Sequence, residues 1–547
     1  MADPGDALNT VYRYHDATKH HPGRYARSLG YMDWATQPEP FLHLAGAPLV
    51  ELPGPAAGPD PIWDEVPGGG LPAAPLNAHT LSRLFWTSLA LSAWKQVDGP
   101  DGRVVSRWAL RVNPSSGNLH PTEGWLLCGA VPGLSGAPGL HHYRADRHGL
   151  ERCRELDPAQ WPAGLGPGRF LLGLSSVVWR ETWKYGERSF RYCCHDTGHA
   201  LAALDLAAAA LGWQTRLLAD LDDGLVGRVL GCDRRAGPER DHPDALVLVS
   251  TAGSIDDVII PPPGDWVASS PWVGVAAPLS SAHQSWPLLD ELRDAVAGPG
   301  RVWAGRVAPR PAAPPAGVRP ARFTSLVRGR RSAVSMDGST AMPAEAFFAL
   351  LGRLMPDRTP RPFGLLPWPP AVSLALFVHR VEGLAPGLYL LQRDPAHGPS
   401  LRACLRAESA WEPVPGPPAE LPLFRLGSGD LRAHACALSC NQEIAADGAF
   451  AVAMLARFDD GLVAGGPGMY PRLFWETGTI GQMLYLEAEA AGLQGTGIGC
   501  FFDDEVHRLL GIADHSWQSL YHFTVGGAVL DGRIRTAPAY GHLPEVG

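Results

Sequence analysis

The chain has 547 residues, of which 45% are hydrophobic and 18% charged, and its formal net charge is −9. Because single cores stop growing well below this length, we expect two large globular domains. The acidic balance gives no electrostatic reason to expect nucleic acid or an anionic membrane as a partner. The opening MADPGDALNT lacks a basic segment followed by an apolar run, so we expect no signal peptide. No stretch approaches the roughly 20 apolar residues that span a bilayer.

The nine cysteines are scattered along the chain, and only Cys193 and Cys194 are close in sequence. Adjacent cysteines rarely form a bridge, and no His or Cys cluster has the spacing of a metal site. The sequence therefore predicts neither a disulfide framework nor a metal centre, and it favours a reducing, cytoplasmic location. Most of the cysteines are expected to be small buried hydrophobic residues.

The first motif in chain order is a turn-rich string, residues 111–121, between two apolar segments. Prolines restrict its backbone, while two hydroxyls, a glycine and an amide offer hydrogen bonds over a short span. Such a loop suits a flat heterocycle with a polar edge, and an ordinary turn without a ligand is the alternative. The candidate binding residues are Pro114, Ser115, Ser116, Gly117 and Asn118.

A second motif, Trp183–Arg188, precedes a helix that we expect to begin near His195. At the start of a helix, a carboxylate accepts hydrogen bonds from backbone N–H groups that have no partner within the helix. Asp196 is therefore predicted to cap this helix.

The strongest organisational signal is an ungapped internal repeat at an offset of 280 residues, between residues 195–231 and 475–511. Both copies open with an acidic residue and Thr-Gly, have glycine at the equivalent positions 212 and 492, and close on Leu-Gly. Apolar residues recur at near-helical spacing before each glycine, which accepts the left-handed conformation that ends many helices. A strand and a short helix should follow. The repeat predicts a duplicated domain.

The segment between the copies, residues 296–320, holds six prolines and no acidic residue. This composition predicts a semi-rigid, solvated linker. The expected domains are therefore residues 1–295, which carry the Pro-Ser-Ser loop, and residues 321–547.

Directly after this linker, Arg330 and Arg331 stand beside Ser332, ahead of a helix-like segment. Guanidinium groups pair bidentately with phosphoryl oxygens, so the cluster suits a phosphate, and an exposed basic helix N-terminus is the alternative. Further along, residues 444–454 also read as a helix.

The second repeat copy contains an alternating-glycine run formed by Gly495, Gly497 and Gly499, with Ile498 inside it. Glycines let backbone N–H groups approach a ligand without obstruction by Cβ atoms. Residues 521–525 then read as the last strand, and Arg533 and Arg535 follow it.

Together these motifs resemble the nitroreductase-like FMN-dependent superfamily, and within it the SagB/ThcOx-type dehydrogenases with tandem nitroreductase domains, from about residue 10 to 540. That family is marked by an Arg-Arg-Ser start, a Pro-Ser-(Ser/Ala)-Gly loop and a helix-Gly-strand unit ending in alternating glycines. The string Tyr14–His21 is also typical of its long members. The resemblance implies that these segments contact FMN and that Arg533 or Arg535 completes the phosphate contacts.

The resemblance also implies an α+β fold, in which each half has an antiparallel-dominated sheet flanked by helices. The halves would pack as an intramolecular pseudo-dimer.

The halves lack different motifs. The first half has the Pro114–Asn118 loop but no Arg-Arg-Ser, and it reads Gln214–Leu217 where the second copy has glycines. The second half has the arginines and glycines, but residues 363–370 contain no serine or asparagine where its loop should be. We therefore expect one FMN per chain, bound by the first half's loop and the second half's arginines and glycines.

The resemblance assigns catalysis to Lys184 and Tyr185, because SagB-type azoline dehydrogenases carry an adjacent Lys-Tyr pair in this region. Hydride removal requires that a proton leave the neighbouring carbon, and a buried lysine or a tyrosine beside a cation can accept it. The alternative is a lysine that extends to the surface beside a core tyrosine.

The predicted function is therefore an FMN-dependent dehydrogenase or oxidase that acts on a peptide-derived or amino-acid-derived substrate, of the azoline-to-azole type. Biosynthetic enzymes are the expected partners, and the chain is expected to be a monomeric pseudo-dimer or a weak oligomer. One alternative is an NAD(P)H-dependent reductase of nitro compounds or quinones. Another is a flavin-free scaffold that binds a peptide or a partner enzyme.

Overall fold

A computed structural model describes residues 4–54, 58–256, 258–260, 266–267, 269–298, 320–415 and 421–543. The chain divides into two compact units that interleave along the sequence. Unit 1 consists of Met1–Arg27, Ile62–Gly68 and Arg301–Leu530, and unit 2 of Ser28–Pro61, Gly69–Gly300 and Asp531–Gly547. Most of the predicted linker lies outside the described residues, so the linker and the domain boundaries stay predictions.

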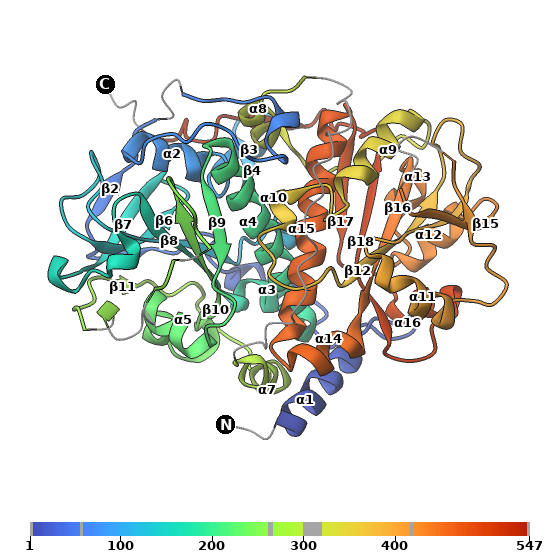
Figure 1. The fold of residues 1–547 in the computed structure, drawn as a ribbon, viewed down its shortest axis with the longest axis horizontal. Helices are drawn as coiled ribbons and strands as arrows, with labels where there is room; N and C mark the ends of the chain where they lie inside the picture. The colour runs from blue at the N-terminus through green and yellow to red at the C-terminus, as the bar shows by residue number, and fades with distance from the viewer. Residues whose placement is uncertain are drawn as a thin grey trace. The chain divides into compact units, whose positions relative to one another are not determined.

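Unit 2 is built on a seven-stranded antiparallel sheet in the order β2-β7-β6-β5-β8-β10-β9 (Figure 1). Its strands are, in that order, Leu49–Glu51, Gly149–Glu155, Gly139–Arg144, Thr122–Cys128, Arg169–Ser176, His242–Ser250 and Gln214–Leu217. The helices are α2 (Ala78–Trp86), α3 (Val178–Tyr185), α4 (Ser189–Ala210), α5 (Asp223–Leu230) and α7 (Pro287–Val296). Two short strands, β1 (Leu44–Ala45) and β11 (Val275–Ala276), pair beside them.

Unit 1 has a seven-stranded antiparallel sheet in the order β14-β15-β13-β12-β16-β18-β17. Its strands are, in that order, Glu412–Pro413, Leu423–Ser428, Gly387–Leu391, Val372–Val378, Phe450–Arg457, Trp517–Gly526 and Gln494–Ile498. The helices are α1 (Pro4–Ala17), α8 (Phe323–Gly329), α9 (Ala344–Arg353), α10 (Pro360–Phe363), α11 (Gly398–Cys404), α12 (Arg432–Leu438), α13 (Ile444–Asp447), α14 (Phe458–Gly465), α15 (Met469–Ala490) and α16 (Asp503–Leu510).

The duplication is confirmed. Six strands of each sheet occupy equivalent positions, β7-β6-β5-β8-β10-β9 in unit 2 and β15-β13-β12-β16-β18-β17 in unit 1, while the outer edge strands β2 and β14 come from different places in the sequence. α4 and α15 both have 22 residues at the 280-residue offset. Each long helix is followed by a glycine with positive φ, Gly212 at +69° and Gly492 at +76°, and then by an edge strand and an eight-residue helix. The predicted α+β class is confirmed as well. The packing of the halves as a pseudo-dimer stays a prediction.

The core of each unit lies between its sheet and its long helix. All 22 residues of α4 are buried, as are all seven of β5 and all seven of β12. α4 lies against β5, β8 and β9, and α15 lies against β12, β17 and β18. Residues 200–210 of α4 are apolar apart from Asp205, and a helix segment that is apolar all round is covered in this way. This arrangement places the opening of each repeat copy deep in its unit.

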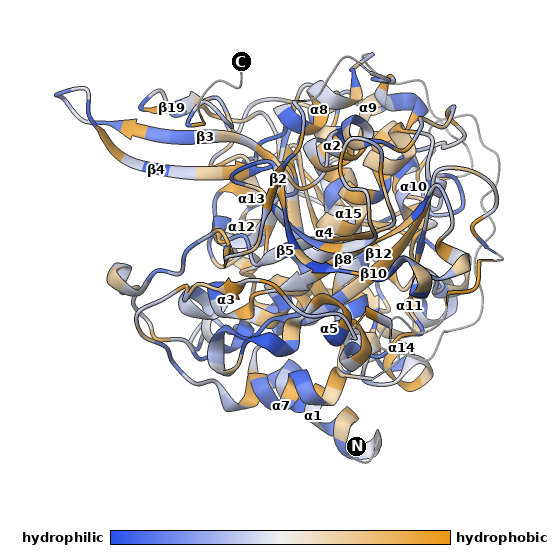
Figure 2. Ribbon diagram, turned by 90° about the vertical axis from the view of Figure 1, so that its left-hand side faces the viewer, coloured by the Kyte–Doolittle hydropathy of each residue, from blue (hydrophilic) through white to orange (hydrophobic). Residues whose placement is uncertain are grey.

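Three predictions of elements are wrong. α4 begins at Ser189, so Asp196 lies inside the helix and does not cap it. The helix expected over residues 444–454 ends at Asp447, because the apolar run that follows is the buried strand β16, paired with β12 and β18. The strand at 521–525 is not the last one. β19 (Ile534–Ala537) follows it and joins β3 (Leu91–Asp98) and β4 (Val104–Arg111) in the three-stranded ribbon of unit 2 (Figure 2).

No helix in the described part of the chain is both long enough and apolar enough to cross a membrane.

The buried carboxylate of Glu476 is expected to be essential for the stability of unit 1. It accepts hydrogen bonds from Arg393 Nη1 at 2.6 Å and from the backbone N–H groups of Ala371 and Val372 at 2.9 and 3.2 Å. Glu476→Ala leaves the Arg393 guanidinium buried without its counter-charge, so the free energy of unfolding should fall by about 3–5 kcal/mol. Urea unfolding followed by circular dichroism measures this.

Asp430→Ala is the matched control, because Asp430 pairs with Arg432 on the exposed surface of the same unit. An exposed pair contributes little, so this variant should unfold like the parent. If Glu476→Ala unfolds at the same urea concentration as the control, Glu476 does not hold the unit together.

Candidate functional site

The Pro114–Asn118 loop is held by its own polar groups. Gly117 and Asn118 have φ of +56° and +60°, a left-handed backbone that glycine and asparagine adopt with the least strain. Ser115 Oγ accepts a hydrogen bond from the backbone N–H of His120 at 2.8 Å, and Asn118 Nδ2 donates to the carbonyl of Ala109 at 2.8 Å. Gly117 stays exposed while Pro114 is buried. The turn chemistry predicted from the sequence therefore builds a rigid loop with an accessible tip.

Asp196 of α4 holds this loop in place through hydrogen bonds. Its carboxylate accepts hydrogen bonds from Ser116 N at 2.9 and 3.1 Å and from Ser116 Oγ at 2.9 Å. Burial raises the pKa of Asp196 to about 7, against the lowering effect of the hydrogen bonds from Ser116. The acidic residue that opens the repeat thus acts on the loop instead of on its own helix.

Lys184 and Tyr185 lie against the tip of the loop. A Cβ atom added to Gly117 would stand 2.5 Å from Tyr185 Oη and 3.1 Å from Lys184 Nζ. Both side chains are half-buried, and the ammonium nitrogen lies 5.2 Å from the centre of the Tyr185 ring. Within unit 2 the structure therefore brings the predicted catalytic pair and the predicted binding loop together.

Glu181 stands one turn of α3 before this pair. Its side chain is fully buried, and neither carboxyl oxygen has a hydrogen-bond partner among the residues that the structure describes. Burial, and then the neighbouring charge of Asp196, raise the pKa of Glu181 well above its usual value, although Lys184 opposes this. Burial therefore favours the protonated, neutral form of Glu181.

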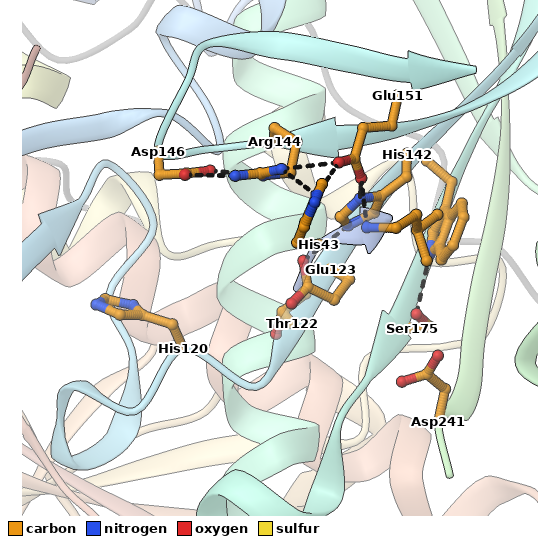
Figure 3. Close-up of polar contacts among 12 residues, drawn as sticks. His43, His120, Thr122, Glu123, His142, Arg144, Asp146, Glu151, Ser175 and Asp241 are labelled. Atoms are coloured by element: carbon orange, nitrogen blue, oxygen red, sulfur yellow. Dashed lines mark hydrogen bonds and ion pairs between the residues drawn. The ribbon is translucent and has the colours of Figure 1, made fainter. Parts of the chain in front are cut away.

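A buried polar network fixes both α3 and the end of the loop. Arg180 donates from Nη1 to the carbonyl of His120 at 2.8 Å and to the carboxylate of Glu123. His142 lies between Glu123 and Glu151, at 3.1 Å from each (Figure 3). Burial alone would lower the pKa of His142, but hydrogen bonds to the two carboxylates outweigh it and raise the pKa. This network sets the position of α3 relative to β5.

In unit 1, the Arg-Arg-Ser segment and the glycine run meet around Tyr485 of α15. The guanidinium carbon of Arg330 lies 4.9 Å from the centre of the Tyr485 ring. The Tyr485 hydroxyl lies 2.9 Å from Ser332 Oγ and accepts a hydrogen bond from Gly497 N at 3.0 Å. Ser332 also pairs with Gly495 as an isolated parallel bridge. Arg330 is buried just after α8, so the alternative of an exposed helix N-terminus is wrong.

The charges around Arg330 suit an anion. Burial lowers its pKa to about 10, and the adjacent charge of Arg331 lowers it further, while Tyr485 and the carboxylate of Glu489 oppose the shift. Two adjacent guanidinium groups, one buried and one half-buried, thus stand beside Ser332. Guanidinium groups pair bidentately with phosphoryl oxygens, so these residues fit the phosphate of a nucleotide.

The glycines at 495 and 497 also have a packing role. A Cβ atom at Gly495 would lie 2.6 Å from the Phe523 ring, and one at Gly497 would overlap the hydroxyl of Tyr521. Both rings come from the neighbouring strand β18. These two glycines are therefore required by close packing on one side, apart from any contact with a ligand. Ile498, the last residue of β17, is buried, and Gly499, which follows it, is half-buried.

Arg533 and Arg535 belong to unit 2 and are exposed. Arg533 pairs with Asp531 at 2.7 Å, and Arg535, on β19, pairs with Asp98 at 3.1 Å. Each guanidinium therefore already has a carboxylate partner. The role of either one in a phosphate site stays a prediction.

A cavity of about 530 Å³ in unit 2 lies between α3 and α7, with Trp179, Arg240, Trp286 and Arg293 among the residues of its wall. None of the predicted site residues lines it. The site is therefore better defined by the loop and Lys184 than by this cavity.

Sequence reasoning missed Glu181, Tyr485 and Glu489, and it gave Asp196 the wrong role. Tyr485 and Glu489 are four residues apart on α15, which places both on one face of the helix. The repeated acidic residue before Thr-Gly was a signal for Asp196, because Glu476 at the equivalent position also binds the start of the neighbouring strand. No sequence signal distinguishes Glu181 from an exposed glutamate.

Comparison with known proteins agrees with this fold. Residues 410–527 match the model of the nitroreductase family. An Anabaena variabilis protein, whose crystal structure was solved as a nitroreductase candidate, covers 95% of this chain and 99% of its own at 22% identity, with a TM-score of 0.68. The chain therefore has a nitroreductase-type fold over both of its units.

Two further solved structures are more distant. The E. coli microcin synthetase complex McbBCD covers 46% of this chain and 95% of its own at 17% identity, with a TM-score of 0.27. The FMN-dependent nitroreductase NfnB from Mycobacterium smegmatis, solved with NADPH, covers 37% and 86% at 14% identity, with a TM-score of 0.19. No curated protein matches the chain significantly.

The raised pKa of Asp196 predicts a specific dependence of stability on pH. In the unfolded chain this carboxyl ionises near pH 3.8, and in the folded chain near pH 7, so the folded state binds more protons between these values. Stability should therefore fall as pH rises from about 4 to about 7. Asp196→Asn removes this loss, and the variant should exceed the parent by up to about 4 kcal/mol at pH 8.

Urea unfolding at pH 4, 6 and 8 measures the difference between the two proteins, with Asp256→Asn as an exposed control in the same unit. The difference for Asp196→Asn should grow with pH, while the control should follow the parent throughout. A difference that stays constant from pH 4 to pH 8 would mean that Asp196 has an ordinary pKa.

Proposed function

We propose that the protein is an FMN-dependent oxidoreductase that oxidises a peptide-derived or amino-acid-derived substrate. The observation that carries the proposal is the cluster in unit 2, where Lys184 and Tyr185 lie against Gly117 of the Pro-Ser-Ser loop. The nitroreductase-type fold and the phosphate-suited arginines of unit 1 support it. Fold alone would not, because one fold hosts many functions.

FMN, when bound, supplies a two-electron acceptor for hydride. Arg330 and Arg331 would hold its phosphate, with Ser332 and the glycine segment beside them. The Pro114–Asn118 loop would present its accessible tip at Gly117 to the polar edge of the ring system. The arginines occur in one half of the sequence and the loop in the other, which supports one FMN per chain.

Lys184 is the group that we assign to proton removal. When a hydride leaves one ring atom of an azoline, a proton must leave the adjacent carbon before the ring becomes aromatic. The amine of Lys184 can accept that proton at Nζ, and Tyr185 Oη, beside it at the loop, can orient the substrate.

Asp196 has a positioning role. It fixes Ser116, so the loop keeps its shape while the tip at Gly117 remains accessible. Pre-organisation of this kind lowers the free energy that binding would otherwise spend on ordering a loop.

Arg330→Ala and Ser116→Ala should both weaken FMN binding, although they lie in different halves of the sequence. Loss of a charge-assisted contact to phosphate costs about 1.5–3 kcal/mol, or roughly a 10- to 100-fold rise in Kd for Arg330→Ala. Quenching of FMN fluorescence during titration measures this. Arg432→Ala is the control, since Arg432 is an exposed arginine of unit 1 paired with Asp430. An unchanged Kd for Arg330→Ala would exclude the assigned phosphate site.

Lys184→Ala should retain FMN but lose roughly 10²- to 10⁴-fold in turnover, because general bases contribute about that much. Oxygen uptake with a synthetic thiazoline peptide measures turnover, and Lys95→Ala on β3 is the control lysine of unit 2. Normal turnover in Lys184→Ala would contradict its role. If NAD(P)H instead bleaches the bound flavin in stopped flow and the thiazoline peptide supports no oxygen uptake, the protein is a reductase and the dehydrogenase proposal is wrong.

A further inference from the structure

Two cysteines that are 60 residues apart in sequence lie in contact in unit 1. The sulfur atoms of Cys440 and Cys500 are 2.7 Å apart, with both residues present as thiols. Cys440 follows α12, and Cys500 directly follows Gly499 of the candidate flavin-binding segment. The pair was not foreseen from the sequence, because neither spacing nor motif connects the two residues.

Hydrogen bonds fix the two chain segments on either side of the sulfur atoms. Gln442 Nε2 donates to the carbonyls of Ser439 and Cys500, at 2.8 and 3.0 Å, and Phe502 N donates to the carbonyl of Leu438 at 2.8 Å. The turn itself is constrained, because Cys440 and Asn441 have φ of +54° and +59°. Consecutive left-handed residues other than glycine cost free energy and persist only where the surroundings enforce them. The two segments are thus held together by hydrogen bonds that do not involve the sulfur atoms.

Both thiols are accessible, in contrast to the pair that is adjacent in sequence. Cys440 and Cys500 are half-buried, whereas Cys193 and Cys194 are fully buried. Burial raises the pKa of Cys193 and of Cys194 well above the usual value, so these two remain unreactive thiols. The Cys440–Cys500 pair is therefore the more accessible of the two pairs.

We propose that Cys440 and Cys500 form a redox-active dithiol site, which a low-molecular-weight disulfide such as oxidised glutathione converts to an intramolecular disulfide. The thiolate of one cysteine attacks a sulfur of the glutathione disulfide, which gives a mixed disulfide and releases one glutathione thiolate. The second cysteine, after losing its proton, attacks the protein sulfur of the mixed disulfide and releases the second glutathione. Two protein thiols are oxidised and one glutathione disulfide is reduced to two thiols.

The contact places the second cysteine where it can attack the mixed disulfide formed at the first. A disulfide bond needs a sulfur separation of about 2.05 Å, so the sulfur atoms need to move by less than about 1 Å. In reducing cytoplasm, disulfides that form are usually transient, catalytic or redox-sensing. The bond would join the turn at residues 439–442 to the segment that follows the glycine run. Oxidation of the pair would therefore form a covalent link at the end of the candidate flavin-binding segment. This inference does not depend on the proposed function.

The test uses the full-length protein, incubated with oxidised glutathione and then alkylated, with intact-mass and peptide mass spectrometry as readouts. The expected product has lost two hydrogen atoms, carries no glutathione and contains a Cys440–Cys500 linked peptide. In Cys440→Ser and in Cys500→Ser, the remaining thiol should instead retain one glutathione that the parent protein does not. Cys436→Ser, a half-buried cysteine of α12, is the matched control and should form the linked peptide like the parent.

Three outcomes would overturn the proposal: stable glutathione adducts on both cysteines of the parent protein, a linked peptide that involves Cys436 or Cys404 instead, or full alkylation of Cys440 and Cys500 after the treatment. The single variants keep the test informative if one serine replacement unfolds the protein, since the other variant and the parent are read independently.

Discussion

A buried carboxylate on the long helix of each unit fixes the segment that leads into the central strand of the sheet. In unit 1 this is Glu476, which binds two backbone N–H groups at the start of β12 and the guanidinium of Arg393. In unit 2 it is Asp196, which binds the backbone and the hydroxyl of Ser116 just before β5. The same position of the repeat therefore connects helix to sheet in both units. The candidate loop has its shape because of this contact.

The two copies use this carboxylate for different purposes. In unit 1 an arginine and two N–H groups satisfy it, so it is structural. In unit 2 no arginine reaches Asp196 by hydrogen bond among the described residues, and its pKa rises to about 7. The shorter aspartate leaves room for a hydroxyl-bearing loop, and a second buried carboxyl, Glu181, lies beside it. Unit 2 thus holds two buried acidic side chains near Lys184. Groups with strongly shifted pKa values are often found at functional sites.

Much of the fold could be predicted from the sequence, because the repeat contains glycines that mark where its long helices end. Gly212 and Gly492 end the two long helices as expected, and the strand and short helix after each are where the pattern indicated. The start of α4 could not be predicted, since residues 189–194 gain their helical state from burial and not from a capping residue. The strand β16 was mistaken for a helix because a continuous apolar run is ambiguous between the two.

The candidate site was predictable only where local chemistry defines it. The turn residues of the Pro114–Asn118 loop and the arginines beside Ser332 follow from side-chain chemistry within a few residues. The contact of Gly117 with Tyr185, the packing of the Arg330 guanidinium on the Tyr485 ring and the burial of the Glu181 carboxyl depend on tertiary packing. No single segment of the sequence contains the information for them.

The central claim is that one chain binds one FMN and uses it for oxidation. The most direct measurement is the absorbance spectrum of the purified full-length protein after saturation with FMN and removal of excess, with protein and flavin quantified separately. We predict a flavin band near 450 nm and a ratio close to one flavin per chain. The absence of a flavin band would contradict FMN binding itself, and a ratio of two flavins per chain would contradict the single site.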